Sequence, residues 1–170
     1  LGRGPFSWAQ GYIQVKRPGF EMRFHPSLAV HQTDLTTQQI DAGWWLTRQA
    51  LLEAKQMAQD AGGRLVILLF PMRERTYRSL LREVAPQEGE AAYSADAVWQ
   101  RMIDLGQEAG IEVIDLTPAF AERAEMGAQL YFRTDGHWNE EGHALAAQTI
   151  YEALRQRGLL PGDLSTTSVR

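Results

Sequence analysis

One segment limits the fold of this 170-residue chain more than any other. Residues 64–70 read Arg-Leu-Val-Ile-Leu-Leu-Phe, so an extended backbone places apolar side chains on both faces. A strand that is apolar on both faces is typical of the centre of a parallel sheet, where helices cover both sides. The apolar run, Leu65 to Pro71, is far shorter than the roughly 20 residues that cross a membrane. The segment therefore predicts an α/β domain.

A helix is predicted before this strand. Apolar residues that recur at steps of three and four lie on one face of a helix. The helix begins at Thr36 or Thr37 and ends at Gly62 and Gly63. Its inward face consists of seven residues: Ile40, Trp44, Thr47, Leu51, Ala54, Ala58 and Ala61. The neighbouring Trp45 points sideways, and we interpret the tryptophan pair as core packing or contact with a missing segment rather than as a carbohydrate platform.

The order of elements after the strand completes an α/β pattern. We expect a short helix over 77–84, a second long helix over 94–110 and a second strand over 111–115. Asn139 then caps a last helix, which ends near Gly158. Alternating helices and strands predict a parallel sheet with right-handed crossovers.

The chain divides into three parts. Residues 1–34 are irregular, with strand-like pieces at Tyr12–Lys16 and Glu21–Phe24 that predict a small hairpin. Residues 35–160 form the α/β domain, and 161–170 form a frayed tail. A sheet of only two parallel strands would leave an apolar strand with an unpaired, exposed edge. Such an edge favours self-association of the chain. Either the hairpin pairs with this sheet or, as we favour, upstream strands are missing and belong to a longer chain.

Composition excludes several classes of function. The net charge of −4 and the pI near 5.6 give no global electrostatic reason to bind nucleic acid or anionic lipid. Cysteine is absent, which excludes a disulfide framework, a Cys-ligated zinc ion and a thiol nucleophile. The first residues, Leu1–Pro5, lack the apolar region of a signal peptide, so the sequence leaves the compartment open.

One short motif carries chemistry, and it lies between an expected strand and the last helix: Asp135-Gly136-His137-Trp138-Asn139. Loops at the carboxyl ends of parallel strands are where such sheets bind ligands. A serine nucleophile needs an imidazole base that a carboxylate holds in one tautomer. Residues two apart in an extended loop project to the same side, so Asp135 is predicted to contact the His137 ring. Gly136 supplies backbone freedom for this contact.

The residues around this motif resemble a known family. Residues 131–143, Tyr-Phe-Arg-Thr-Asp-Gly-His-Trp-Asn-Glu-Glu-Gly-His, look like the last conserved block of SGNH (GDSL-like) hydrolases. They most resemble the Asp-x-His-Trp variant of alginate acetyltransferase-like proteins, since ordinary members space the Asp and His one residue wider. Residues 69–77 resemble a strand–Pro–basic–Glu–x–x–Tyr stretch of the same proteins. The resemblance implies an SGNH, flavodoxin-like, three-layer fold with a parallel sheet, incomplete here because N-terminal strands are missing.

The resemblance also implies roles for residues. Asp135 and His137 are the expected catalytic pair of a serine esterase or O-acyl transferase that acts on a small-molecule or glycan ester. This chemistry needs no metal and no organic cofactor. The family's Gly-Asp-Ser block is absent, and Leu1–Ser7 and Pro161–Ser165 approximate it only distantly. We therefore expect the serine upstream of this chain, the isolated chain to be inactive, and a location in the bacterial periplasm or cell envelope.

Further residues are candidates for substrate binding. Arg73, Arg75 and Tyr77 follow the buried strand at its carboxyl end, and Arg73 and Tyr77, together with Trp138, are predicted to meet an acyl or sugar group. The alternative is a solvated turn in which Tyr77 packs on the helix. His143 is interpreted as a hydrogen-bonded core histidine rather than as a metal ligand. The rival function is a non-catalytic SGNH-derived module that binds a polysaccharide or a protein.

Overall fold

The computed structural model describes residues 6–9, 12–24, 37–86 and 96–160. The predicted tail at 161–170, Pro161–Ser165 within it, and most of Leu1–Ser7 lie outside these ranges. The strands are β1 (Phe6–Ala9), β2 (Tyr12–Arg17), β3 (Phe20–Phe24), β4 (Val66–Leu69) and β5 (Glu112–Asp115). The helices are α2 (Thr37–Asp60), α3 (Arg73–Thr76), α4 (Arg78–Val84), α6 (Asp96–Ala109), α7 (Thr117–Glu125) and α8 (Glu140–Gln156).

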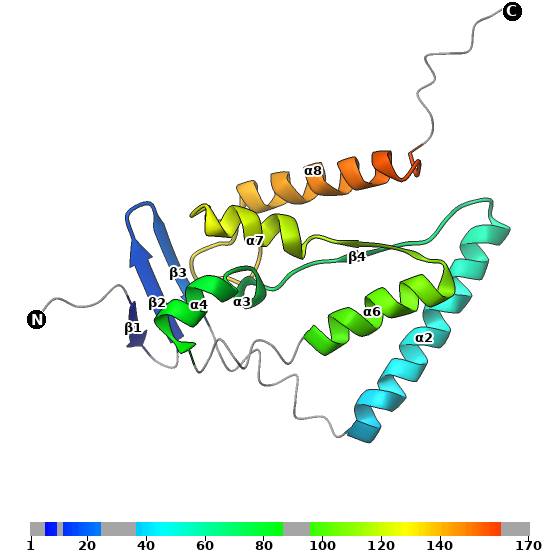
Figure 1. Ribbon diagram of the computed structural model, residues 1–170, viewed down its shortest axis with the longest axis horizontal. Helices are drawn as coiled ribbons and strands as arrows, with labels where there is room; N and C mark the ends of the chain where they lie inside the picture. Colours follow the sequence, from blue (N-terminus) through cyan, green and yellow to red (C-terminus); the bar gives the residue numbers. More distant parts are fainter. Residues whose placement is uncertain (1–5, 10–11, 25–36, 87–95, 161–170) are drawn as a thin grey trace, which may run out of the picture.

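Strands β4 and β5 form the predicted parallel pair. Val66 stands opposite Glu112 and Leu69 opposite Asp115, so both strands end at the same edge of the sheet. In Figure 1, α7 and α8 lie on one side of this pair, and α6 and α2 lie on the other. Helices on both faces of a parallel sheet are the arrangement that an α/β domain requires.

The N-terminal strands form a separate antiparallel sheet in the order β1-β2-β3. The hairpin of β2 and β3 pairs Ile13 with Phe24 and Arg17 with Phe20, which confirms the predicted hairpin. Its turn contains Gly19, whose φ of 74° lies in the left-handed region that favours glycine. Within the described ranges this sheet does not pair with β4 or β5, so pairing of the hairpin with the parallel sheet, one of the two solutions offered for the open edge, is wrong.

The hydrophobic core joins the N-terminal sheet to the α/β part of the chain. The Tyr77 ring packs edge-on against Phe20, Phe24 and Tyr131, with ring centroids 5.4, 5.8 and 6.0 Å away. The largest fully buried side chains come from both parts: Tyr131, Phe24, Phe120, Ile13, Met22, Leu116, Leu130 and Val15. Residues before position 34 therefore supply much of the core that the sequence assigned to the α/β domain, although the predicted boundary itself stays a prediction.

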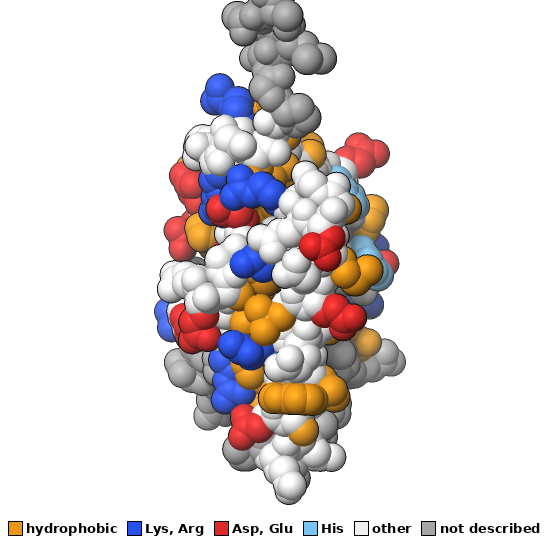
Figure 2. Space-filling model, turned by 90° about the vertical axis from the view of Figure 1, so that its right-hand side faces the viewer, with side chains coloured by type: hydrophobic (Ala, Val, Ile, Leu, Met, Phe, Trp, Pro, Cys, Tyr) orange, Lys and Arg blue, Asp and Glu red, His pale blue; other side chains and the backbone are white. Residues whose placement is uncertain are grey.

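The parallel pair is less well covered than its sequence predicts. Val66, Ile67 and Leu68 are apolar, yet each is only half-buried. The seven residues of the predicted inward face of α2 are likewise at best half-buried, and Trp45 is 61% exposed. Figure 2 shows apolar side chains between charged ones down one face of the molecule. Among the described residues no helix is both long and apolar enough to traverse a bilayer.

Candidate active site

A short main-chain ladder holds the Asp135–His137 motif. The N–H of Phe132 donates to the carbonyl of His137 at 3.0 Å, and the N–H of Asn139 donates to the carbonyl of Leu130 at 3.0 Å. This ladder makes residues 130–139 a tight hairpin. The expectation of a strand directly before the motif is wrong, since the structure has an isolated bridge there instead of a strand.

Side chains of the hairpin alternate between its two faces. Residues that stand opposite each other in an antiparallel pair point to the same side. Tyr131 and Trp138 form the bridge, and Tyr131 is buried at 1% exposure while Trp138 is half-buried. Phe132 and His137 are the next opposed pair, and both are open to solvent, with Phe132 51% exposed. The hairpin therefore anchors itself through one face and presents His137 on the other.

The predicted contact between Asp135 and His137 is confirmed. Oδ1 of Asp135 lies in hydrogen-bonding contact with Nδ1 of the His137 ring and also accepts the His137 main-chain N–H at 3.0 Å. These bonds, the main-chain one first, hold the pKa of the Asp135 carboxyl below its ordinary value. Nε2 of His137 makes no hydrogen bond to a described residue, and the side chain is 86% exposed. One ring nitrogen is thus held by a carboxylate while the other is free to take a proton.

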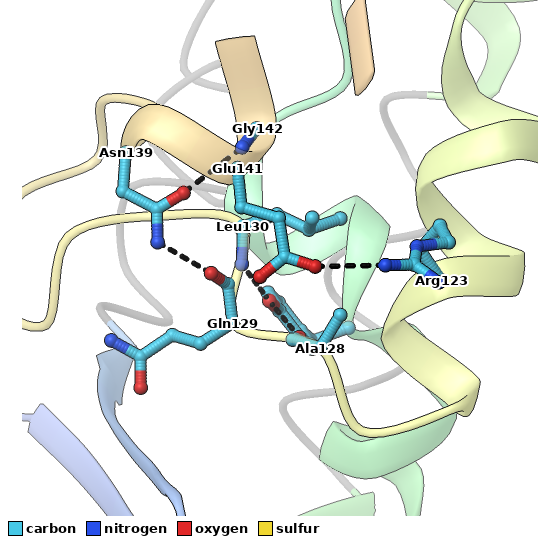
Figure 3. Close-up of polar contacts among 8 residues, drawn as sticks. Arg123, Ala128, Gln129, Leu130, Asn139, Glu141 and Gly142 are labelled. Atoms are coloured by element: carbon cyan, nitrogen blue, oxygen red, sulfur yellow. Dashed lines mark hydrogen bonds and ion pairs between the residues drawn. The ribbon is translucent and has the colours of Figure 1, made fainter. Parts of the chain in front are cut away.

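Asn139 fixes the end of the hairpin to α8, as the capping prediction requires (Figure 3). Its Oδ1 accepts the N–H of Gly142 at 2.9 Å, and its Nδ2 donates to the carbonyl of Gln129. Beside it, Arg123 of α7 and Glu141 of α8 form an ion pair at 2.9 Å. The start of α8 is therefore tied both to the hairpin and to the neighbouring helix.

Glycine is required at the start of α8 and not between the two candidate catalytic residues. A Cβ at Gly142 would lie 2.2 Å from the carbonyl oxygen of Leu130 and 3.0 Å from Cβ of Trp138. A Cβ at Gly136 would meet nothing within 4 Å, and the φ of Gly136 lies outside the left-handed region. The prediction that Gly136 supplies necessary backbone freedom is therefore wrong, because any residue fits its position.

The hairpin is braced on its other side by β3. The N–H of Arg23 donates to the carbonyl of Arg133 at 2.9 Å, and the N–H of Glu21 donates to Oε1 of Gln129 at 3.0 Å. The Arg133 guanidinium pairs with the Glu21 carboxylate at 3.0 Å and lowers the pKa of that carboxyl. Strand β3 and the hairpin are consequently one hydrogen-bonded unit.

The candidate substrate-binding residues have internal partners. Arg73 is 4% exposed and donates to the Asp135 carbonyl, and Tyr77, 2% exposed, donates its hydroxyl to the carbonyl of Ala128 and accepts from the N–H of Leu130. Arg75 lies over the ring of Trp99 instead. Contact of Arg73, Tyr77 and Trp138 with a substrate stays a prediction.

An aromatic cluster adjoins the hairpin. The Trp138 ring lies 4.9 Å from Phe120, 5.2 Å from Phe70 and 5.5 Å from His143, measured between ring centroids. Phe70 is 49% exposed and directly follows β4, which places the hairpin at the carboxyl end of that strand. His143 is exposed, so its interpretation as a core histidine is wrong.

The pair itself lies on an open surface. A pocket of about 320 Å³ is lined by Tyr77 together with Arg17, Phe20 and Glu125. Neither Asp135 nor His137 lines this pocket. In the described part of the chain no group of three or more His, Asp or Glu side chains is placed to hold a metal ion. The Asp135 carboxylate orients the His137 ring at this surface, and among the described residues no serine makes a hydrogen bond to that ring.

We expect Gly142→Ala to destabilise the protein and to loosen the hairpin. The added methyl group clashes with a main-chain carbonyl, and such overpacking costs about 1–3 kcal/mol, more than the ~1 kcal/mol that alanine gains over glycine in a helix. Chemical denaturation measures the change. Gly136→Ala is the matched control, because its position has open space, and an equal loss of stability in both variants would contradict the explanation.

The hairpin is expected to weaken in acid. The pKa values of Asp135 and Glu21 are lowered in the folded protein from ordinary values of 3.8 and 4.5. Groups with lowered pKa values stabilise the fold above their ordinary pKa, and that contribution is lost as the pH falls through the folded values. The protection factors for amide exchange of residues 131–138, which are corrected for the intrinsic pH dependence of exchange, should therefore fall below about pH 4. Exchange protection that is constant from pH 6 to 3 would contradict this.

Comparison with known proteins identifies the family of this chain and several relatives. Probable alginate O-acetylases AlgJ of Pseudomonas putida and Pseudomonas syringae are each 31% identical over 105 residues, 62% of this chain but 26% and 25% of those proteins. The chain thus spans about a quarter of the length of these relatives. The solved O-acetyltransferase domain of Pseudomonas putida AlgJ superposes with a TM-score of 0.52 and 25% identity, over 72% of this chain and 43% of that one. Residues 30–170 match the family model, and the chain belongs to the SGNH hydrolase-like domain family of the acetyltransferase AlgX.

Proposed function

We propose that this chain supplies the acid–base pair of an SGNH-type O-acyl transferase or esterase, with His137 as general base and Asp135 as its orienter. The observation that carries the proposal is the Asp135–His137 contact on Nδ1, which leaves Nε2 free and exposed. Membership of an acetyltransferase family favours this enzyme over a non-catalytic binding module.

The reaction follows from this geometry. Nε2 of His137 takes the proton of a serine hydroxyl while the serine oxygen bonds to the acyl carbonyl carbon. The Asp135 carboxylate stabilises the imidazolium, which then returns the proton to the leaving alkoxide. An acceptor hydroxyl, or water, next attacks the acyl carbon of the acyl-enzyme while His137 removes its proton; the bond from that carbon to the serine oxygen then breaks, and His137 returns the proton to the serine oxygen. A hydroxyl acceptor gives transfer and water gives hydrolysis.

A polysaccharide hydroxyl is the acceptor that we propose. The relatives are named as probable alginate O-acetylases, and alginate is a polysaccharide. His137 stands on an open face of the hairpin, where a polymer can reach it without threading into a closed cavity. Because these relatives are bacterial proteins named as alginate O-acetylases, we also propose that this protein is located in the bacterial cell envelope.

The serine comes from a segment other than the hairpin. The described serine nearest the hairpin in sequence, Ser79, binds Glu125 rather than His137. Val66, Ile67 and Leu68 on β4 are apolar but only half-buried, and we propose that further polypeptide covers them and carries the nucleophile. We propose that this segment precedes Leu1 in a longer chain, as the family resemblance implies.

Fluorophosphonate labelling of the longer protein tests this proposal. We expect one serine to be labelled in the parent protein and labelling to fall about 10³-fold or more in His137→Ala, as loss of a triad base does. His143→Ala is the matched control and should label normally. The 170-residue chain alone should not hydrolyse p-nitrophenyl acetate above its own His137→Ala background.

Peptide mapping of the label separates the alternatives. A labelled serine before Leu1 agrees with the predicted order, whereas one after Arg170 keeps the triad and shows that order to be wrong. Absence of labelling would instead support the binding module, and labelling that His137→Ala leaves unchanged would count against the triad.

We also propose that the isolated chain self-associates through β4 and the exposed apolar residues of α2. Trp45, Leu46 and Met57 are 61, 61 and 66% exposed, and apolar surfaces of this kind promote association. Light scattering during size-exclusion chromatography should show concentration-dependent oligomers. Ile67→Lys, which places a charge on β4, should shift them toward monomer, while Gln49→Lys on α2 serves as the control. A monomer at all concentrations would rule the association out.

A further inference from the structure

A buried ion pair adjoins the hairpin that holds Asp135 and His137. Arg73 and Glu74 are the first residues of α3 and are 4% and 5% exposed. Oε1 of Glu74 accepts from Nη2 of Arg73 at 3.0 Å and from Nε at 3.3 Å. The guanidinium carbon also lies 5.6 Å from the centroid of the Phe24 ring. Two donors and one face of the guanidinium are therefore held by the protein.

The remaining end of the guanidinium is directed at the hairpin. Nη1 of Arg73 donates to the main-chain carbonyl of Asp135 at 3.2 Å, across 62 residues of sequence. A buried charge that donates to a loop carbonyl is a stronger constraint than a neutral hydrogen bond at the surface. The Asp135 carbonyl belongs to the same residue whose carboxylate contacts His137, so the bond acts on the residue that orients the base.

A buried ion pair such as Arg73–Glu74 adds little to the stability of a fold. Removing two charges from water carries a penalty that their attraction offsets only with favourable geometry, and replacement by apolar residues is often neutral or stabilising. The Phe24 ring already lies against the guanidinium and would pack against an apolar side chain there. Stability alone therefore does not account for an arginine and a glutamate at these positions.

We propose that Arg73 is a positioning residue for the acid–base pair. Glu74 orients the guanidinium, the guanidinium fixes the main chain at Asp135, and the fixed main chain keeps the Asp135 carboxylate against Nδ1 of His137. The catalytic meaning of this arrangement rests on the proposed function. The anchoring itself is a property of this chain and needs no nucleophile.

Arginine suits this role better than lysine. Its planar guanidinium presents donors in fixed directions, so one edge binds Glu74 while another reaches Asp135. A lysine ammonium keeps the charge beside Glu74 but has a single nitrogen and lacks the second, pre-oriented donor. The substitution Arg73→Lys therefore removes the anchor and retains the buried charge.

The experiment follows Asp135 by NMR in the 170-residue chain. Carboxyl titration gives the pKa of Asp135, and ¹⁵N relaxation gives order parameters for residues 133–137. In Arg73→Lys we expect the Asp135 pKa to rise toward its ordinary value of 3.8, because the hydrogen bonds from His137 that lower it become intermittent. The order parameters should fall from about 0.85, typical of rigid backbone, to below about 0.6.

Two further variants make the result decisive. Arg73→Leu with Glu74→Leu removes both charges of the ion pair together, and it should remain folded while the hairpin loses order. Arg75→Lys is the matched control, since Arg75 lies on the same helix but over Trp99, and it should change neither reading. An unchanged Asp135 pKa and unchanged order in folded Arg73→Lys would overturn the proposal, whether or not the double variant folds.

These readings are independent of the proposed function. If Arg73→Lys changes Asp135 as expected but the longer protein takes no fluorophosphonate label, the anchor stands and the hydrolase assignment fails. If labelling depends on His137 but Asp135 is unaffected by Arg73→Lys, the assignment stands and the anchor fails. In an active parent protein, a functioning anchor predicts slower labelling for Arg73→Lys and normal labelling for Arg75→Lys.

Discussion

The hydroxyl of Tyr131 makes the contact on which the arrangement of the site depends. It donates to the carbonyl of Pro71 at 2.6 Å and lies 2.9 Å from Oγ1 of Thr76, so it joins the hairpin to the chain directly after β4. Burial raises the pKa of Tyr131 to about 12, so the phenol keeps its proton and remains a donor at neutral pH. Through this bond a hairpin far along the sequence is held at the carboxyl end of the parallel pair.

Much of the fold could be predicted because its signals are local. Continuous apolarity identified β4, the spacing of three and four identified α2 and α6, and the Asn139 cap identified the start of α8. The contact between Asp135 and His137 was predictable for the same reason, since two residues of extended backbone determine it. Resemblance added the family, which spacing alone does not give.

The unpredicted features depend on contacts across long sequence separations. Gly142 and Gly106 look like ordinary helix glycines, yet a Cβ at either would lie 2.2 Å from an atom of another segment, Leu130 or Val113. Arg73 follows a strand in a way that suggests an exposed pocket residue, yet in the folded protein it is buried, with Phe24 of β3 against its guanidinium and the Asp135 carbonyl at its end. The adjacent Glu74, an opposite charge directly beside it, was the one available signal. Strand β1 and the exposure of His143 had none that we identified.

The bracing of the hairpin by β3 has a consequence for how such domains can be recombined. The main-chain N–H groups of Arg23 and Glu21 bind Arg133 and Gln129, and Phe24 lies against Arg73, so β3 and the Asp–His hairpin share one set of interactions. Chimaeras between relatives that exchange the α/β portion alone would combine a hairpin from one parent with a brace from the other. The smallest transferable unit of this site therefore includes the N-terminal strands, although they contribute no reacting atom.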